Sequence, residues 1–142
     1  MIDRRGFLAL CAFCLWPVLP ALAEPARLSV AAAYEKAAAG QLVLIDIRSP
    51  AEWRETGVGV SAIPISMHRP GFMEKVAKLT GGDKSKPLAV ICASGGRSSV
   101  IAPKLEQAGY TQIYNVAEGM LGGRYGNGWI PSGLPVKPYT GE

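Results

Sequence analysis

Residues 87–98 decide the fold, and they read Pro87-Leu88-Ala89-Val90-Ile91-Cys92-Ala93-Ser94-Gly95-Gly96-Arg97-Ser98. The first half, up to Ile91, is a short apolar run of the kind that forms a fully buried parallel strand. Apolar residues at helical spacing follow over 98–108, so Cys92 is expected between a strand and a helix. Backbone N–H groups of the glycine-rich loop and the positive end of that helix would converge on the sulfur and favour its thiolate form.

The same alternation of strand and helix patterns continues on both sides of this stretch. It implies a single α/β domain with a mostly parallel sheet and helices on both faces. Ser29 is expected to cap the first helix, and Gly40 to end it. The predicted helices are 30–39, 50–55, 71–79 and 98–108, and the predicted strands are 42–47, 63–67, 88–91 and 112–116.

Ligands of such sheets bind at the carboxyl ends of the strands, where this chain places several polar residues. Arg97 follows Cys92, and because a buried arginine needs a carboxylate partner, we expect it to pair with Asp46 or Glu52. Orienting an anionic donor is a second use for Arg97. The loop around the sulfur consists of Ala93, Ser94, Gly95, Gly96 and Arg97.

Four further groups end the neighbouring predicted strands and are expected to face the same site: Asp46, Arg48, His68 and Glu118. His68 is interpreted as an ordinary strand-end polar residue. Its alternative role is to assist proton transfer near Cys92.

The N-terminal 23 residues have the pattern of a cleaved export signal. Arg4 and Arg5 precede an apolar stretch over 6–19 that is too short to span a bilayer, so no membrane anchor is expected after cleavage. Ala21-Leu22-Ala23 fits a signal-peptidase site, which places the mature start at Glu24 and the protein in the periplasm. The paired arginines resemble a twin-arginine signal, although such pairs also occur in Sec signals.

The charge and the cysteines limit the classes of partner. The 142 residues carry 15 Lys and Arg against 11 Asp and Glu, a formal net charge of +4, without a basic run, so nucleic acid is not an expected partner. Cys11 and Cys14 lie inside the signal, which leaves Cys92 as the one mature cysteine and excludes an internal disulfide. One cysteine and one histidine are too few for a structural zinc site, so no metal is expected.

Two motifs resemble those of the rhodanese family. They are Asp46-Ile47-Arg48-Ser49-Pro50-Ala51-Glu52-Trp53 and Cys92-x-x-Gly95-x-Arg97-Ser98, within a similarity over residues 27–136. The resemblance implies a rhodanese-like domain over 24–142 and a sulfurtransferase that carries sulfane sulfur as a persulfide on Cys92, with no other cofactor. It implies thiosulfate-like anions or persulfides as donors, and a thiol, cyanide or a partner protein's cysteine as acceptor. The histidine that the family has in its Gly-His-Ile-Pro-Gly-Ala segment is replaced here by Val58.

The residues of the Cys92 loop also allow other hypotheses about its function. A non-catalytic sulfur carrier, or an accessory module of a periplasmic complex, would also retain Cys92. A cysteine-dependent phosphatase or arsenate reductase places five residues between its cysteine and arginine, whereas four lie between Cys92 and Arg97. A serine hydrolase at Ser94 is disfavoured because Cys92 stands where the nucleophile turn needs glycine.

Overall fold

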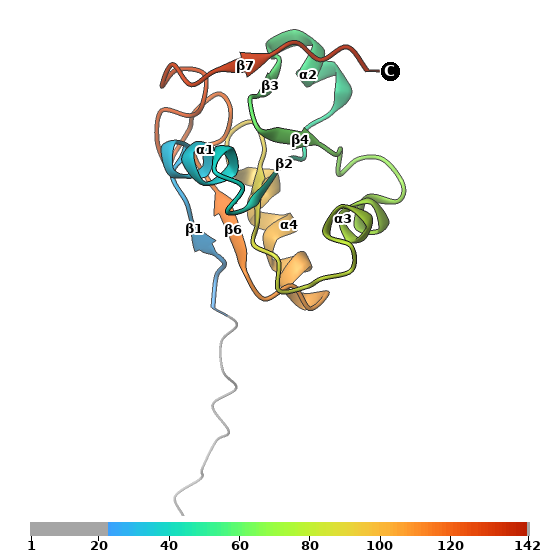
Figure 1. Cartoon of the computed structure of the whole chain (residues 1–142). Helices are drawn as coiled ribbons and strands as arrows, with labels where there is room; N and C mark the ends of the chain where they lie inside the picture. Colours follow the sequence, from blue (N-terminus) through green and yellow to red (C-terminus); the bar gives the residue numbers. More distant parts are fainter. Residues whose placement is uncertain (1–22, 142) are drawn as a thin grey trace, which may run out of the picture.

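The computed structural model describes residues 23–141, and its centre is a five-stranded parallel sheet (Figure 1). The strands are β1 (Ala26–Arg27), β2 (Val43–Asp46), β4 (Ala62–Pro64), β5 (Leu88–Ile91) and β6 (Ile113–Val116). Their order across the sheet is β1-β6-β5-β2-β4, with every neighbouring pair parallel. β5, which leads to Cys92, therefore lies in the middle of the sheet. A second sheet pairs β3 (Val58–Gly59) with β7 (Val136–Lys137) in antiparallel fashion.

The first helix begins at the cap that the sequence predicts, and the second begins at a capping box. Ser29 accepts a hydrogen bond from the backbone N–H of Ala32 at the first helix. Ser49 and Glu52 form a reciprocal capping box at the second, behind Pro50. The helices are α1 (Val30–Ala38), α2 (Pro50–Thr56), α3 (Phe72–Thr80) and α4 (Gly96–Gln107).

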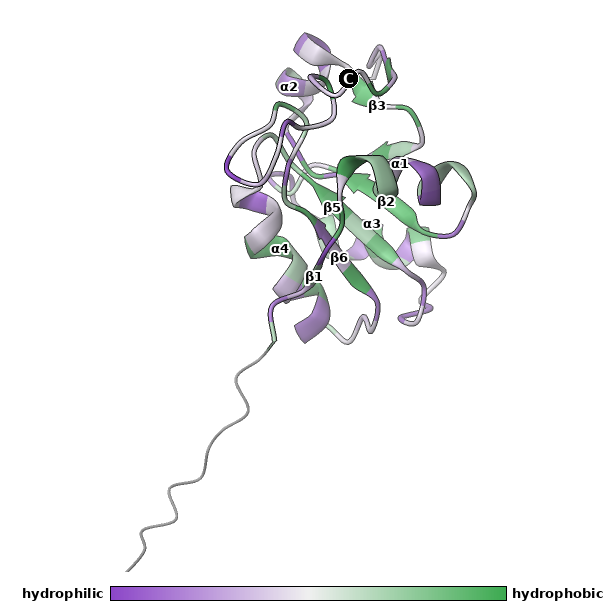
Figure 2. Cartoon of the chain, turned by 90° about the vertical axis from the view of Figure 1, so that its left-hand side faces the viewer, coloured by the Kyte–Doolittle hydropathy of each residue, from purple (hydrophilic) through white to green (hydrophobic). Residues whose placement is uncertain are grey.

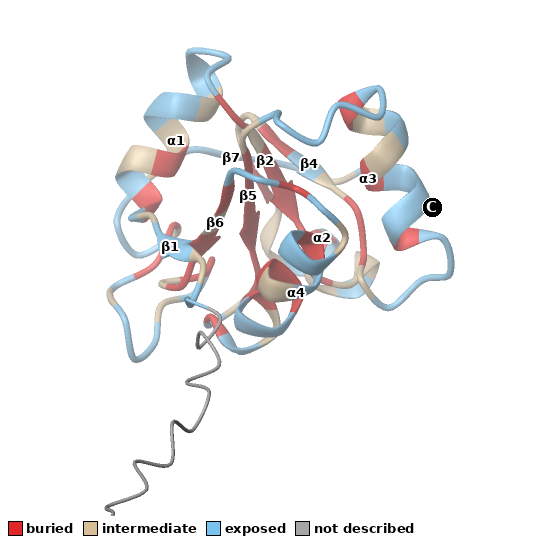
Figure 3. Ribbon diagram, turned by 90° about the horizontal axis from the view of Figure 1, so that it is seen from below, coloured by how far each residue is buried: buried red, intermediate tan, exposed pale blue. Residues whose placement is uncertain are grey.

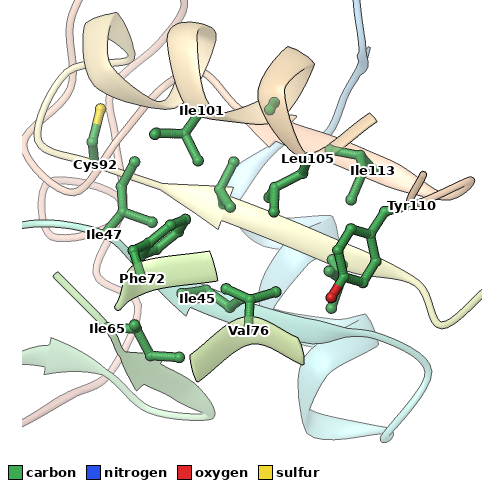
Figure 4. Close-up of a cluster of buried hydrophobic side chains, with 13 residues drawn as sticks. Ile45, Ile47, Ile65, Phe72, Val76, Cys92, Ile101, Leu105, Tyr110 and Ile113 are labelled. Carbon is green, nitrogen blue, oxygen red and sulfur yellow. The ribbon is translucent and has the colours of Figure 1, made fainter. Parts of the chain in front are cut away.

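Helices cover both faces of the sheet, because successive strand residues point to opposite sides. Ile45 and Val90 pack in a core cluster with side chains of α3 and α4 (Figure 4). Leu44 and Ala89 belong to a second cluster, which includes side chains of α1 and α2. The central strands β2, β5 and β6 are apolar and deeply buried, and the hydrophilic residues lie mainly on the helices and loops (Figures 2 and 3).

The predicted α/β class and its eight elements are confirmed, with differences at their ends. α4 begins at Gly96, two residues before the predicted start, because Gly95 adopts a left-handed conformation (φ 94°) and caps the helix. The strand predicted over 63–67 ends at Pro64. The strands β1, β3 and β7 are two residues long, too short for a periodic pattern to reveal them. In residues 23–141, the helices are too short or too polar to cross a bilayer.

Candidate active site

Cys92 follows the last residue of β5 and lies under the first turn of α4 (Figure 4). Its side chain is buried, with the residue only 1% exposed. The sulfur accepts backbone hydrogen bonds from Gly95 (3.2 Å) and Ser98 (3.4 Å), and lies 3.5 Å from the Ser98 hydroxyl oxygen. Burial raises the pKa of Cys92, but the side chain and backbone of Ser98 and the N–H groups of Gly95 and Ser94 outweigh it. The net pKa is below the ordinary value, which favours the thiolate.

The segment that follows β6 holds the outside of the Cys92 loop. The N–H of Met120 donates to the carbonyl of Cys92 (2.8 Å), and the N–H of Leu121 donates to the carbonyl of Ala93 (2.9 Å). Two carbonyls of the loop therefore point away from the sulfur. This direction leaves the N–H groups of the loop to face it, as a site for negative charge requires.

Gly95 is the position of the loop at which the backbone demands glycine. Its φ of 94° lies in the left-handed region, and a β-carbon there would clash with the carbonyl oxygen of Ala117. Its neighbour Gly96 has open space where a β-carbon would lie. The Gly-Gly pair thus contains one obligatory glycine and one tolerant position.

The side chain of Arg97 extends to α2, where it pairs with Glu52. Its two terminal nitrogens donate to the two carboxylate oxygens over 2.8 and 2.6 Å. The hydrogen bond from Arg97 lowers the pKa of Glu52 to about 2, and the same bond raises the pKa of Arg97. Of the two carboxylates expected as partners, the structure therefore selects Glu52.

The carboxylate of Asp46 forms its ion pair with Arg48. The two side chains are fully buried and form a close pair, with Nη2 of Arg48 2.8 Å from Oδ2 of Asp46. Arg48 also donates to the Thr56 hydroxyl and the Gly57 carbonyl, which fastens the end of α2 to β2. The expectation that these two charges face the site is wrong, since a buried arginine is stable where a carboxylate and carbonyls satisfy its donors.

Glu118 likewise holds the fold together. Its carboxylate accepts from the backbone N–H groups of Val30 (3.2 Å) and Gly128 (3.3 Å), so it binds the start of α1 to the C-terminal segment. The expectation that it faces the site is also wrong, because the unpaired N–H at the helix start attracts the carboxylate.

His68 lies beside Arg97, with its Nε2 3.3 Å from a guanidinium nitrogen. An arginine can only donate, so Nε2 accepts in this contact. Because β4 ends at Pro64, His68 lies in the turn after that strand and not at its end. At the position of the family's histidine, Val58 is buried in the apolar cluster with Trp53.

Three polar residues behind the loop have roles that the sequence did not indicate: Ser98, which was named only as part of the motif, and Ser99 and Asn115. Both serine hydroxyls donate to the carbonyl of Gly95, and Asn115 donates to Ser99. The available signal was a lone amide inside the otherwise apolar strand β6. Within residues 23–141, His, Cys, Asp and Glu side chains form no cluster of three or more that could bind a metal ion.

A family model and a curated relative both match this chain, and they indicate the same family. The model of the rhodanese-like domain matches residues 29–123. A sulfurtransferase from Allochromatium vinosum is 30% identical over 96 residues, which cover 67% of this chain and 78% of the relative.

Solved structures agree with this match. The polysulfide-sulfur transferase homodimer from Wolinella succinogenes has a TM-score of 0.65 and 28% identity, covering 82% of this chain and 81% of that one. The crystal structure of Rv0390 from M. tuberculosis has a TM-score of 0.63 and 27% identity, covering 82% of this chain and 100% of that one. With its parallel sheet and its cysteine loop between β5 and α4, the chain belongs to the family of proteins with a rhodanese-like domain.

Proposed function

We propose that this protein is a sulfurtransferase that carries sulfane sulfur as a persulfide on Cys92. The observation that supports it best is the buried sulfur with backbone N–H groups of Gly95 and Ser98 directed at it. The same loop would stabilise the negative terminal sulfur of a persulfide, as an oxyanion hole stabilises oxygen. The sulfur is held by a covalent bond, so the proposed reaction needs no metal or organic cofactor.

The proposed reaction has two displacements. The Cys92 thiolate attacks the outer sulfur of a donor such as thiosulfate, a new S–S bond forms, and sulfite leaves with the electron pair of the broken S–S bond. An acceptor thiolate or cyanide then attacks the terminal sulfur of the persulfide. The bond to Sγ breaks, its electron pair returns to Cys92 as thiolate, and the acceptor departs with the sulfur.

The donors that we propose are small anions such as thiosulfate, or persulfides, and the acceptors are thiols, cyanide or the cysteine of a partner protein. The loop presents N–H groups and small side chains, and its one arginine is neutralised by Glu52. This arrangement also speaks against a phosphatase or arsenate reductase. Such enzymes need the arginine to hold the oxyanion, whereas Arg97 is engaged on α2.

We also propose that residues 1–23 are an export signal and that the mature protein acts in the periplasm from Glu24 onward. This proposal rests on the Arg4-Arg5 pair, the short apolar stretch and Ala21-Leu22-Ala23. Residues 1–22 lie outside the described part of the structure, whose first β-strand begins at Ala26.

Intact mass spectrometry tests the sulfur chemistry directly. The purified protein is incubated with thiosulfate, and we expect its mass to increase by one sulfur atom, with the addition mapped to Cys92 and removed by cyanide. The Cys92→Ser variant, treated in the same way, is the control and should gain no sulfur. If thiosulfate, polysulfide and a low-molecular-mass persulfide all fail to add sulfur to the folded protein, the proposed function is wrong.

A further inference from the structure

The carbonyl oxygen of Gly95 accepts a hydrogen bond from the backbone N–H of Ser99 (3.1 Å) and from two hydroxyl groups, which is one donor more than its two lone pairs. The Ser99 hydroxyl lies 2.6 Å from it and the Ser98 hydroxyl 3.1 Å. The Ser98 oxygen is also 3.5 Å from the Cys92 sulfur. A hydroxyl carries a single hydrogen, so Ser98 cannot donate to the carbonyl and to the sulfur at the same time.

Asn115 fixes the direction of the Ser99 hydroxyl. Its Nδ2 donates to the Ser99 oxygen over 3.1 Å, so the hydrogen of Ser99 is left for the Gly95 carbonyl. Because the Gly95 carbonyl can only accept, the Ser99 hydrogen lies between those two oxygens, and a flipped Asn115 amide would face the Ser99 oxygen with a second acceptor. The amide orientation therefore follows from the hydrogen-bond pattern.

The surroundings of the hydrogen bonds from Asn115 to Ser99 and from Ser99 to the Gly95 carbonyl explain why Ser99 needs the Asn115 amide. Ser99 and Asn115 line a cavity of about 330 Å³ between α4 and β1, and Ser99 is exposed there. Water would compete for the Ser99 hydroxyl if nothing held it. Asn115 is only 6% exposed, and its Oδ1 is buried without a hydrogen-bond partner in the described part of the protein. A buried amide oxygen without a partner lowers the stability of the fold, so the presence of Asn115 at this position indicates a role other than stability.

We propose that Asn115 and Ser99 are positioning residues that satisfy the Gly95 carbonyl, so that the Ser98 hydroxyl is available to the Cys92 thiolate. In the thiol state, the S–H of Cys92 donates to Ser98, and Ser98 donates to Gly95. When Cys92 loses its proton, the hydroxyl of Ser98 rotates to donate to the sulfur, and the backbone N–H and the hydroxyl of Ser99 keep both lone pairs of the carbonyl oxygen paired. The inference rests on the proposed function in that this thiolate is the proposed nucleophile.

The test measures the rate of Cys92 alkylation by iodoacetamide as a function of pH in the full-length protein. Ser99→Ala and Asn115→Leu should each raise the apparent pKa of Cys92 and slow alkylation near neutral pH by about three- to tenfold. Ser99→Thr keeps the hydroxyl and should restore the rate. Gln112→Leu is the matched control, because it removes an amide next to β6 that donates to the Ser85 carbonyl. It should leave the alkylation rate and the apparent pKa of Cys92 unchanged.

A double-mutant cycle separates positioning from a general structural effect. If Ser99 acts through Ser98, then Ser99→Ala should slow alkylation in the wild-type background and have no further effect in Ser98→Ala. Equal effects in both backgrounds, or an unchanged pH profile in Ser99→Ala and Asn115→Leu, would overturn the proposal. Thermal unfolding of each variant verifies that the fold is retained. Alkylation needs no sulfur donor, so failure of the persulfide experiment and failure of this one are separate results.

Discussion

Cys92→Ser replaces one atom at the centre of the loop and leaves its hydrogen-bond donors in place. A serine hydroxyl is close to the thiol in size but is not ionised near neutral pH and cannot carry a persulfide. We expect transfer of sulfur from thiosulfate to cyanide to fall to background while the circular dichroism spectrum stays unchanged. Transfer near the wild-type rate would show that Cys92 is not the nucleophile.

Gly95→Ala and Gly96→Ala form a matched pair in the same loop. At Gly95 the β-carbon would clash with the Ala117 carbonyl at a positive φ, and we expect unfolding free energy to fall by about 2–3 kcal/mol. At Gly96 the space is open, and alanine in the first turn of α4 should leave stability unchanged or raise it slightly. Urea unfolding of both variants makes the comparison. Equal losses would contradict the assigned loop geometry.

At the scale of elements, the Glu52–Arg97 pair links α2 to α4 across the site. The folded pKa of Glu52 is depressed to about 2 from its ordinary 4.5, chiefly by the hydrogen bond from Arg97. Its stabilising contribution is therefore complete above about pH 4.5 and is lost as the pH falls toward 2. Because both side chains are partly exposed, we expect this contribution to be about 1 kcal/mol.

Glu52→Gln tests this link, since glutamine retains the capping-box position and removes the charge. Its unfolding free energy near neutral pH should be about 1 kcal/mol below that of the wild type, and the gap should close as both proteins are titrated from pH 5 to about pH 2. Urea unfolding at each pH provides the measurement. A gap that stays constant with pH would mean that the ionisation of Glu52 does not stabilise the fold.

At the scale of the whole molecule, the proposed twin-arginine route predicts export of an already folded protein. Replacing Arg4 and Arg5 with lysine should stall export, because that route needs the paired guanidinium groups whereas Sec needs only positive charge. Cell fractionation, with N-terminal sequencing of the periplasmic form, should find wild-type protein that begins at Glu24. A lysine variant that is exported and cleaved as efficiently as the wild type would instead indicate the Sec route.

Much of this architecture could be predicted from the sequence, because patterns over a few neighbouring residues determine the helices and strands. Apolar runs and helical spacing gave the α/β alternation and the position of Cys92 between β5 and α4. The capping residue Ser29 acts within a few positions of itself, so the start of α1 could be predicted. The sequence by itself therefore determined the class of fold, the central strand and the glycine-rich loop that follows it.

The tertiary structure alone decided which polar groups meet. Arg97 and Glu52 are 45 positions apart, and Glu118 and Val30 are 88 apart, so no local pattern relates them. The choice of Glu52 over Asp46 followed from Arg48, which occupies Asp46 in the interior. The contact of Asn115 with Ser99 likewise depends on β6 lying beside β5 beneath α4. Such pairings are set by the order of strands across the sheet, a long-range property that hydrophobic periodicity does not encode.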